Sequence, residues 1–371
     1  MSRTDRAPIV GDAALRAEYA AALIARGIST ADAHALAAGT QYIPRKAQSA
    51  KLPSRAEASA STDALPGKLS VRGNKLLEVG VAIAIDPPDG DELIFHHSIL
   101  CQTGLPRRKV KGREFQRRVG SAWLHLQAGV LNIAGIPVPQ PIPYGATPRL
   151  ALASISTLAL RTGSPAIEIG RTPADFMRLI GMADTQGSRY ETLRCQFNAM
   201  GACRLQMGFA DQTFNSMAVK QYEAWLPRTA SERNKWPSVL VLTDDFYKEL
   251  LAHGVPLDRR ALHALTGSAL CIDIYTWLAY RLYRIKGPPV AISWAALRMQ
   301  FGQEYEGIHA ADDFRKSFLL ALPKVLAEYP RAKVTRYPGG LELHASPPPV
   351  EPRIFAVSPP LRTQCEEGSA D

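Results

Sequence analysis

The sequence predicts an α+β protein, mainly helical, in which two tandem winged-helix domains follow an N-terminal extension. Between residues 187 and 200, apolar side chains recur at intervals of three and four, as on one face of an α-helix. Residues 203–209 then alternate between apolar and other residues, which is the pattern of a half-buried β-strand. The same order of helices followed by a hairpin recurs between residues 238 and 346. A helix–helix–hairpin order is typical of winged helices.

Composition favours a globular protein that binds a polyanion. The chain has 371 residues, a net charge of +10 and an isoelectric point of about 9.4, and nucleic acid is the commonest polyanionic partner of a basic protein. The alternative is a globular protein that merely happens to be basic.

The start of the chain lacks the apolar core of a signal peptide, and the longest apolar run is shorter than the roughly 20 residues of a membrane span. The cysteines, which include no C-x-x-C pair, are expected to be free thiols in a reducing cytoplasm.

The first 147 residues are expected to form three segments. Residues 1–43 are alanine-rich and predict a helical segment, to which the sequence assigns no role. Residues 44–70, rich in Ser, Ala, Pro, Lys and Arg, predict a disordered linker. In the region 71–147, the stretch VGVAIAI (79–85) predicts a strand. The basic stretch LPRRKVKGREFQRR (105–118) has seven cationic residues and one acid, and it predicts a loop leading into a helix.

The first winged helix is predicted over residues 148–227. RLALASISTLALR predicts its first helix and AIEIG a short strand. The second helix has clear start signals, because Thr172 can cap it, Pro173 suits the first helical position and Asp175 lies just inside. The helix that begins near residue 187 is the predicted recognition helix, and the strand after it opens the wing.

The second winged helix is predicted over residues 238–346. A helix capped by Thr243 comes early in it, and the apolar stretch GSALCIDIYTWLAYRLYRI predicts a buried central helix. Ser293 is expected to cap the next helix, and a further helix buries one face around Phe314. The stretch AKVTRYPGGLELHAS predicts a hairpin, and residues 347–371 predict a disordered tail.

Candidate DNA-binding residues lie on the outward faces of the two recognition helices, on the second wing and in the basic stretch. Arg and Gln side chains can hydrogen-bond guanine and adenine, Thr can meet a phosphate or a thymine methyl, and Lys and Arg can contact phosphates. The candidates are Ser188, Arg189, Thr192, Arg194 and Gln196 in the first helix, Arg315, Lys316 and Lys324 in the second, Lys333 and Arg336 on the second wing, and Arg107, Arg108, Lys109, Lys111 and Arg113, continued by Arg117 and Arg118, in the basic stretch. The alternative for each of them is a solvated surface residue.

Enzyme signatures are missing from the sequence, and we expect no catalytic residue, no metal and no cofactor. No G-x-x-x-x-G-K-[ST] motif is present. His96 and His97 are adjacent rather than in the H-x-H spacing of a metal-dependent nicking nuclease, so they are interpreted as a packing or solvent-facing pair. The acidic residues between Asp86 and Glu92 lie on a Pro-Gly turn, where aspartate is normal.

Five stretches of the sequence are distinctive enough for comparison with known families. They are FHHSILCQTGLPRRKVKGREFQRRVGSAWLHLQAG, PIPYGATPRLALASISTLALRTGSPAIEIG, FMRLIGMADTQGSRYETLRCQFNAMGACRLQMGF, VPLDRRALHALTGSALCIDIYTWLAYRLYRI and FGQEYEG. Together they resemble the RepA-type plasmid replication initiator family. The resemblance runs over residues 70–350. It implies paired winged helices that bind repeated sites at a plasmid origin, with the host helicase, its loader and the host initiator protein as partners. It also implies a homodimer that represses its own promoter.

The hypothesis from the sequence is an iteron-type initiator that binds double-stranded origin DNA in the cytoplasm, deforms it and recruits host replication proteins. Elastic bending of a site of roughly 20–30 base pairs costs roughly 1–6 kcal/mol, which several bound copies can supply. One alternative is a transcriptional regulator with the same fold, because a winged helix alone does not distinguish the two functions. The other alternative, a nicking enzyme, is disfavoured by the missing H-x-H spacing.

Overall fold

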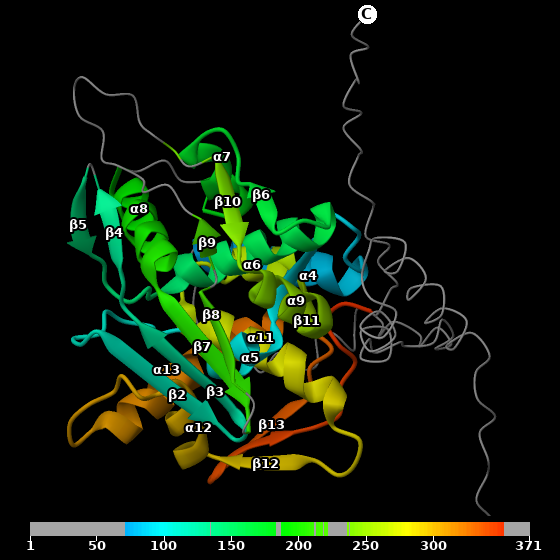
Figure 1. The fold of residues 1–371 in the computed structure, drawn as a ribbon. Helices are drawn as coiled ribbons and strands as arrows, with labels where there is room; N and C mark the ends of the chain where they lie inside the picture. The colour runs from blue at the N-terminus through cyan, green and yellow to red at the C-terminus, as the bar shows by residue number, and fades with distance from the viewer. Residues whose placement is uncertain are drawn as a thin grey trace, which may run out of the picture. The chain divides into compact units, whose positions relative to one another are not determined.

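The computed structural model describes residues 71–133, 135–182, 187–210, 213–217, 219–221, 236 and 238–351. Residues 74–350 belong to one compact unit. Helices and strands alternate along it, which confirms the predicted α+β class (Figure 1). The predicted helical segment 1–43, the linker 44–70 and most of the tail 347–371 lie outside the described residues.

The N-terminal part of the described chain contains α4 (Val71–Ile85), β1 (Leu93–His97), α5 (Ser98–Thr103), β2 (Glu114–Val119), β3 (Ala122–Gln127), β4 (Val130–Ile133) and β5 (Ile136–Pro139). Two predictions are wrong here. The stretch 79–85 is the end of α4 rather than a strand, and it packs so closely that a Cβ added to Gly80 would lie 2.3 Å from the carbonyl oxygen of Ala327. The basic stretch leads into β2 rather than into a helix. Arg117 occupies a buried position of this strand, so the alternation of apolar and polar residues that is typical of a strand is missing from the sequence.

The part predicted as the first winged helix contains α6 (Ala146–Thr162), β6 (Ala166–Glu168), α7 (Pro173–Leu179), α8 (Gly187–Ala202), β7 (Arg204–Phe209), β8 (Phe214–Met217) and β9 (Val219–Gln221). The predicted start of α7 is confirmed. The Thr172 hydroxyl accepts a hydrogen bond from the Asp175 amide at 3.2 Å, and the Asp175 carboxylate accepts one from the Thr172 amide at 3.1 Å. This reciprocal capping box satisfies two N–H donors that a helix start otherwise leaves unpaired.

The part predicted as the second winged helix contains β10 (Val239–Leu242), α9 (Asp244–His253), β11 (Gly254–Asp258), α10 (Arg259–Ala264), α11 (Ala269–Arg281), the 3-10 helix η1 (Leu282–Arg284), β12 (Val290–Ser293), α12 (Trp294–Phe301), α13 (Ala310–Ala327), β13 (Val334–Tyr337) and β14 (Gly340–Leu343). Ser293 caps α12 as predicted, because its hydroxyl accepts a hydrogen bond from the Ala296 amide at 3.2 Å. β13 and β14 form the predicted hairpin, with Tyr337 opposite Gly340 at its closed end.

The described strands form small antiparallel sheets whose orders are β1–β11, β2–β3–β7–β8, β4–β5, β6–β10–β9 and β12–β14–β13. β3 pairs with β7 from Ala122 opposite Phe209 to Gln127 opposite Arg204, so two strands from the region 71–147 extend the hairpin that follows α8. β1 pairs with β11, and β6 pairs with β10. Strands far apart in the sequence therefore hold the unit together.

The predicted burial of the central helix α11 is confirmed. Residues 270–279 are all buried, and α11 contacts α5, α6 and α13. One hydrophobic cluster includes side chains of α6, α8, α11 and α13. Helix α8 lies at the edge of this cluster, so one of its faces is left to solvent (Figure 1).

Candidate nucleic-acid interface

Helix α8, the predicted recognition helix, has one face in the core and the other in solvent. Leu193 and Phe197 are 0% and 2% exposed. Thr192 is exposed, which agrees with the predicted outward face, whereas Arg189 is half-buried. The side chain of Ser188 lies outside the described residues.

Gln196 does not lie on that outward face, which corrects the placement predicted from the sequence. Its side chain is 3% exposed, and its Oε1 accepts a hydrogen bond from the backbone N–H of Tyr144 at 2.7 Å. Helical spacing puts Gln196 one turn beyond Thr192, but the segment 140–145 covers this part of the helix. Gln196 therefore fixes the segment that leads into α6.

Arg194 lies beside the outward face and is paired within the helix. Its Nε donates to Oε2 of Glu191 at 3.0 Å, and its Nη2 makes a second contact with the same carboxylate. Hydrogen bonding to Arg194 lowers the pKa of Glu191. A phosphate that binds Arg194 therefore has to compete with a carboxylate already in place.

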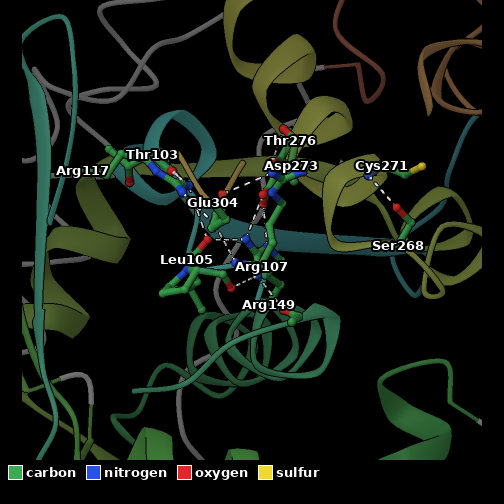
Figure 2. Close-up of polar contacts among 12 residues, drawn as sticks. Thr103, Leu105, Arg107, Arg117, Arg149, Ser268, Cys271, Asp273, Thr276 and Glu304 are labelled. Atoms are coloured by element: carbon green, nitrogen blue, oxygen red, sulfur yellow. Dashed lines mark hydrogen bonds and ion pairs between the residues drawn. The ribbon is translucent and has the colours of Figure 1, made fainter. Parts of the chain in front are cut away.

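The basic stretch divides into a buried part and an exposed part. The side chains of Arg107 and Arg117 are 9% and 0% exposed, and both guanidinium groups bind the carboxylate of Glu304, at 3.2 Å and 3.1 Å (Figure 2). Burial by itself raises the pKa of Glu304, but Arg117 and Arg107 outweigh it and lower that pKa to about 2. Arg107 is thus an internal ion-pair partner, not the solvent-facing cation that the sequence predicts, because the fold supplies a carboxylate 197 positions away.

A second buried ion pair, which the sequence analysis missed, holds the start of the basic stretch. Arg149 of α6 and Asp273 of α11 are 2% and 4% exposed, with Nε–Oδ1 at 2.6 Å and Nη2–Oδ2 at 2.8 Å. Arg149 also donates to the backbone oxygens of Pro106, at 3.0 Å, and Leu105 (Figure 2). The sequence feature that could have indicated this ion pair is a charged residue inside each of two otherwise apolar helical stretches.

The exposed part of the basic stretch consists of Arg108, Lys109, Lys111, Arg113 and Arg118. The Arg108 guanidinium lies 5.6 Å from the centre of the Tyr305 ring, a cation–π contact that restricts the side chain without neutralising it. Arg113 donates to two backbone oxygens, and together with Arg204 it lines a groove of about 620 Å³ beside the end of α8. These cations keep the exposure that a contact with phosphate requires.

The cations predicted for the second recognition helix and its wing are all exposed; they are Arg315, Lys316 and Lys324 on α13, with Lys333 and Arg336 in and beside β13. The Arg315 guanidinium lies 5.3 Å from the Trp294 ring centre. The first turn of α13 carries Asp312 and Asp313, whose charge opposes entry of this end into a DNA groove. The surface suited to phosphate is therefore the middle and end of α13 together with the hairpin.

His96 and His97 form a buried packing pair, which decides between the two interpretations that the sequence left open. They are 5% and 0% exposed, and Nδ1 of His97 accepts a hydrogen bond from the Ile99 amide at 3.2 Å, which caps α5. Burial lowers the pKa of His96 to about 4 and that of His97 to about 3, so both rings are neutral at physiological pH. Within the described residues, no group of three or more His, Cys, Asp and Glu side chains is placed to hold a metal ion.

A family model matches the part of the chain that contains the core helices. The match covers residues 142–295, and the family is described as plasmid-encoded RepA protein. Neither a search of curated proteins nor a search of solved structures gives a significant match. Among the helices described here, none is both long and apolar enough to cross a membrane. The matched range includes α6, α8 and α11, so this part of the chain is similar to the family of plasmid-encoded RepA proteins.

Proposed function

We propose that this plasmid replication protein is an initiator that binds repeated origin DNA through two winged helices. The observation that carries the proposal is the topology of residues 269–343. Helix α11, strand β12, helices α12 and α13 and the hairpin β13–β14 follow in this order, and β12 pairs with β14 rather than with β13. This is the order of a winged helix, in which the third helix of the core is the recognition helix and the hairpin is the wing.

The first half of the unit supports the same proposal with a modified sheet. Elements α6, β6, α7, α8, β7 and β8 repeat the order of the second half. Strand β6 pairs with β10, however, and the β7–β8 hairpin is widened by β3 and β2. A wider sheet gives this wing a stiffer base, which favours a fixed angle between the wing and α8.

The charges indicate how such a protein would hold DNA. Thr192 and Arg189 of α8 would contact base edges, while the exposed cations of the basic stretch and of the β13–β14 hairpin would contact phosphates. Binding of several copies at adjacent repeats would deform the duplex and open an AT-rich neighbour without covalent chemistry. The host helicase and its loader would then enter at the opened DNA, and a dimer would occupy the promoter.

The first test is a footprint on the plasmid's own origin and on a shuffled duplex of equal composition. The protein should protect direct repeats in the origin and none in the shuffled DNA. Thr192→Ala should reduce discrimination between the two by about 1–3 kcal/mol if Thr192 reads a base. Thr162→Ala, which changes another exposed helical threonine at the end of α6, should leave discrimination intact. Absence of protected repeats would reject the proposal.

The second test separates an initiator from a regulator. A plasmid that carries only the origin should be maintained when this protein is supplied in trans and lost when it is not. Maintenance without the protein would favour a transcriptional regulator of the same fold. Strand cleavage with a covalent tyrosine adduct would favour a nicking enzyme instead.

A further inference from the structure

The hairpin β4–β5 stands beside α8 and belongs to no larger sheet among the described strands. Figure 1 shows it running alongside the helix, and residues of α8 contact β4. The base of the hairpin packs tightly against α8, since a Cβ added to Gly129 would lie 1.9 Å from the carbonyl oxygen of Ala202. The backbone N–H of Gln140 also donates a hydrogen bond to the backbone oxygen of Gly129 at 2.9 Å. The hairpin therefore keeps a fixed place next to the helix proposed to enter DNA.

The exposed side chains of this hairpin are uncharged, and all except Asn132 are apolar. Ile136 is 65% exposed and Val130 is 51% exposed, and Pro137 is exposed as well. Residues 130–139 read VLNIAGIPVP and contain no charged side chain. The hairpin therefore cannot contact phosphates as a basic wing does, and its exposed apolar side chains suit an apolar partner surface.

The outer edge of the hairpin is poorly suited to receive a strand from a second copy. β4 ends at Ile133 and β5 begins opposite it at Ile136, so these two residues form the closing hydrogen-bonded pair of the hairpin. Pro137 and Pro139 then occupy the positions whose N–H groups would point outward, and proline has no N–H. The edge of β5 therefore lacks the donors that strand addition needs.

We propose that this hairpin is an apolar wedge for duplex DNA, an inference that rests on the origin binding proposed above. Ile136 and Pro137 insert at a base step next to the groove that α8 occupies, and they partly unstack it. Isoleucine and proline are among the side chains that proteins use to kink DNA in this way. A base step offers an apolar surface without charge, and Gly135, with φ of 85°, allows the tight turn that brings Ile136 to the end of the hairpin.

The experiment uses the full chain and origin duplexes in which a single mismatched base pair is moved along the bound site. A mismatch at the wedged step removes the cost of unstacking in advance, so the wild-type protein should bind that one duplex roughly tenfold more tightly than the intact site. Ile136→Thr keeps a β-branched residue and should reduce this preference to less than about twofold. The matched control Ile85→Thr, at an exposed position at the end of α4, should retain the preference and the bend measured by fluorescence energy transfer.

Three outcomes would overturn the inference. The wild-type protein could show no position-specific gain from a mismatch, or Ile136→Thr could keep the full gain and the full bend. Alternatively, sedimentation without DNA could show that Ile136→Thr converts a dimer into a monomer, which would make the hairpin an interface between copies. Failure of the wild-type protein to bind any origin duplex is a separate result, and it would reject the proposed function together with the wedge.

Discussion

Replacement of Glu304 by glutamine should destabilise the fold by about 3 kcal/mol. The two guanidinium groups bound to Glu304, those of Arg107 and Arg117, are 9% and 0% exposed, so neither can turn to water when the carboxylate is removed. The pKa of Glu304 falls from an ordinary 4.5 to about 2, and each tenfold change in acidity corresponds to about 1.4 kcal/mol. The resulting magnitude of about 3 kcal/mol matches the usual cost of breaking a buried ion pair.

The contribution of Glu304 to the free energy of unfolding should decrease at low pH. Because the pKa of Glu304 is lower in the folded state than in the unfolded state, its stabilisation is complete above pH 4.5 and is lost as the pH falls from 4.5 toward about 2. Urea unfolding, followed by tryptophan fluorescence, should show a difference between wild type and Glu304→Gln that is constant near neutral pH and shrinks by about 1.4 kcal/mol per pH unit below 4.5.

Glu306→Gln is the matched control, because Glu306 is exposed and lies 3.8 Å from the exposed Lys111. An exposed pair of this kind contributes less than about 1 kcal/mol. Two results would refute the reasoning. One is a destabilisation in Glu304→Gln no larger than in Glu306→Gln, and the other is a destabilisation that does not change with pH below 4.5.

Three further changes test other parts of the structure. Glu328 is fully buried, neither of its carboxylate oxygens has a hydrogen-bond partner among the described residues, and burial raises its pKa to about 8. Ionisation of Glu328 is thus disfavoured in the fold, and the resulting loss of stability develops as the pH rises from 4.5 to 8. Glu328→Gln should therefore increase the free energy of unfolding above pH 8, by up to about 5 kcal/mol, and should not do so near pH 4. Urea unfolding at the two pH values would measure the difference. Gln196→Ala should reduce stability by about 1–3 kcal/mol and weaken binding to origin and shuffled DNA equally in anisotropy titrations, because the Tyr144 amide loses its acceptor; a selective weakening on origin DNA would restore Gln196 as a base-reading residue. Replacing Arg108 and Lys109 by glutamine should reduce the slope of log affinity against log salt by roughly 0.9 for each phosphate that is no longer neutralised, and an unchanged slope would leave the two as solvated residues.

Features set by neighbouring residues could be predicted from the sequence. The capping box of Thr172 and Asp175 and the cap at Ser293 depend on groups within three positions of one another. The burial of α11 follows from an apolar stretch with no polar face. The hairpin β13–β14 follows from alternating residues around a Pro-Gly-Gly turn.

Features set by distant residues could not be predicted in this way. The sequence does not indicate which carboxylate binds Arg107 or Arg149, since Glu304 and Asp273 are supplied by other elements of the fold. The outward face predicted for α8 is correct at Thr192 but fails at Gln196, where a segment from outside the helix covers the surface. Charge in a sequence therefore indicates a basic surface only where the fold leaves the cation without an internal carboxylate.

The pairing of β3 with β7 limits which fragments of this protein can be produced with all their strands paired. A fragment limited to the family-matched residues 142–295 would lack β3, the partner of β7, and also β1 and β14, the partners of β11 and β12. Three strands would then present bare backbone groups, which are templates for aggregation. The smallest piece that keeps every described strand beside its neighbour extends from Leu93 to Leu343, well beyond the residues that the family model matches.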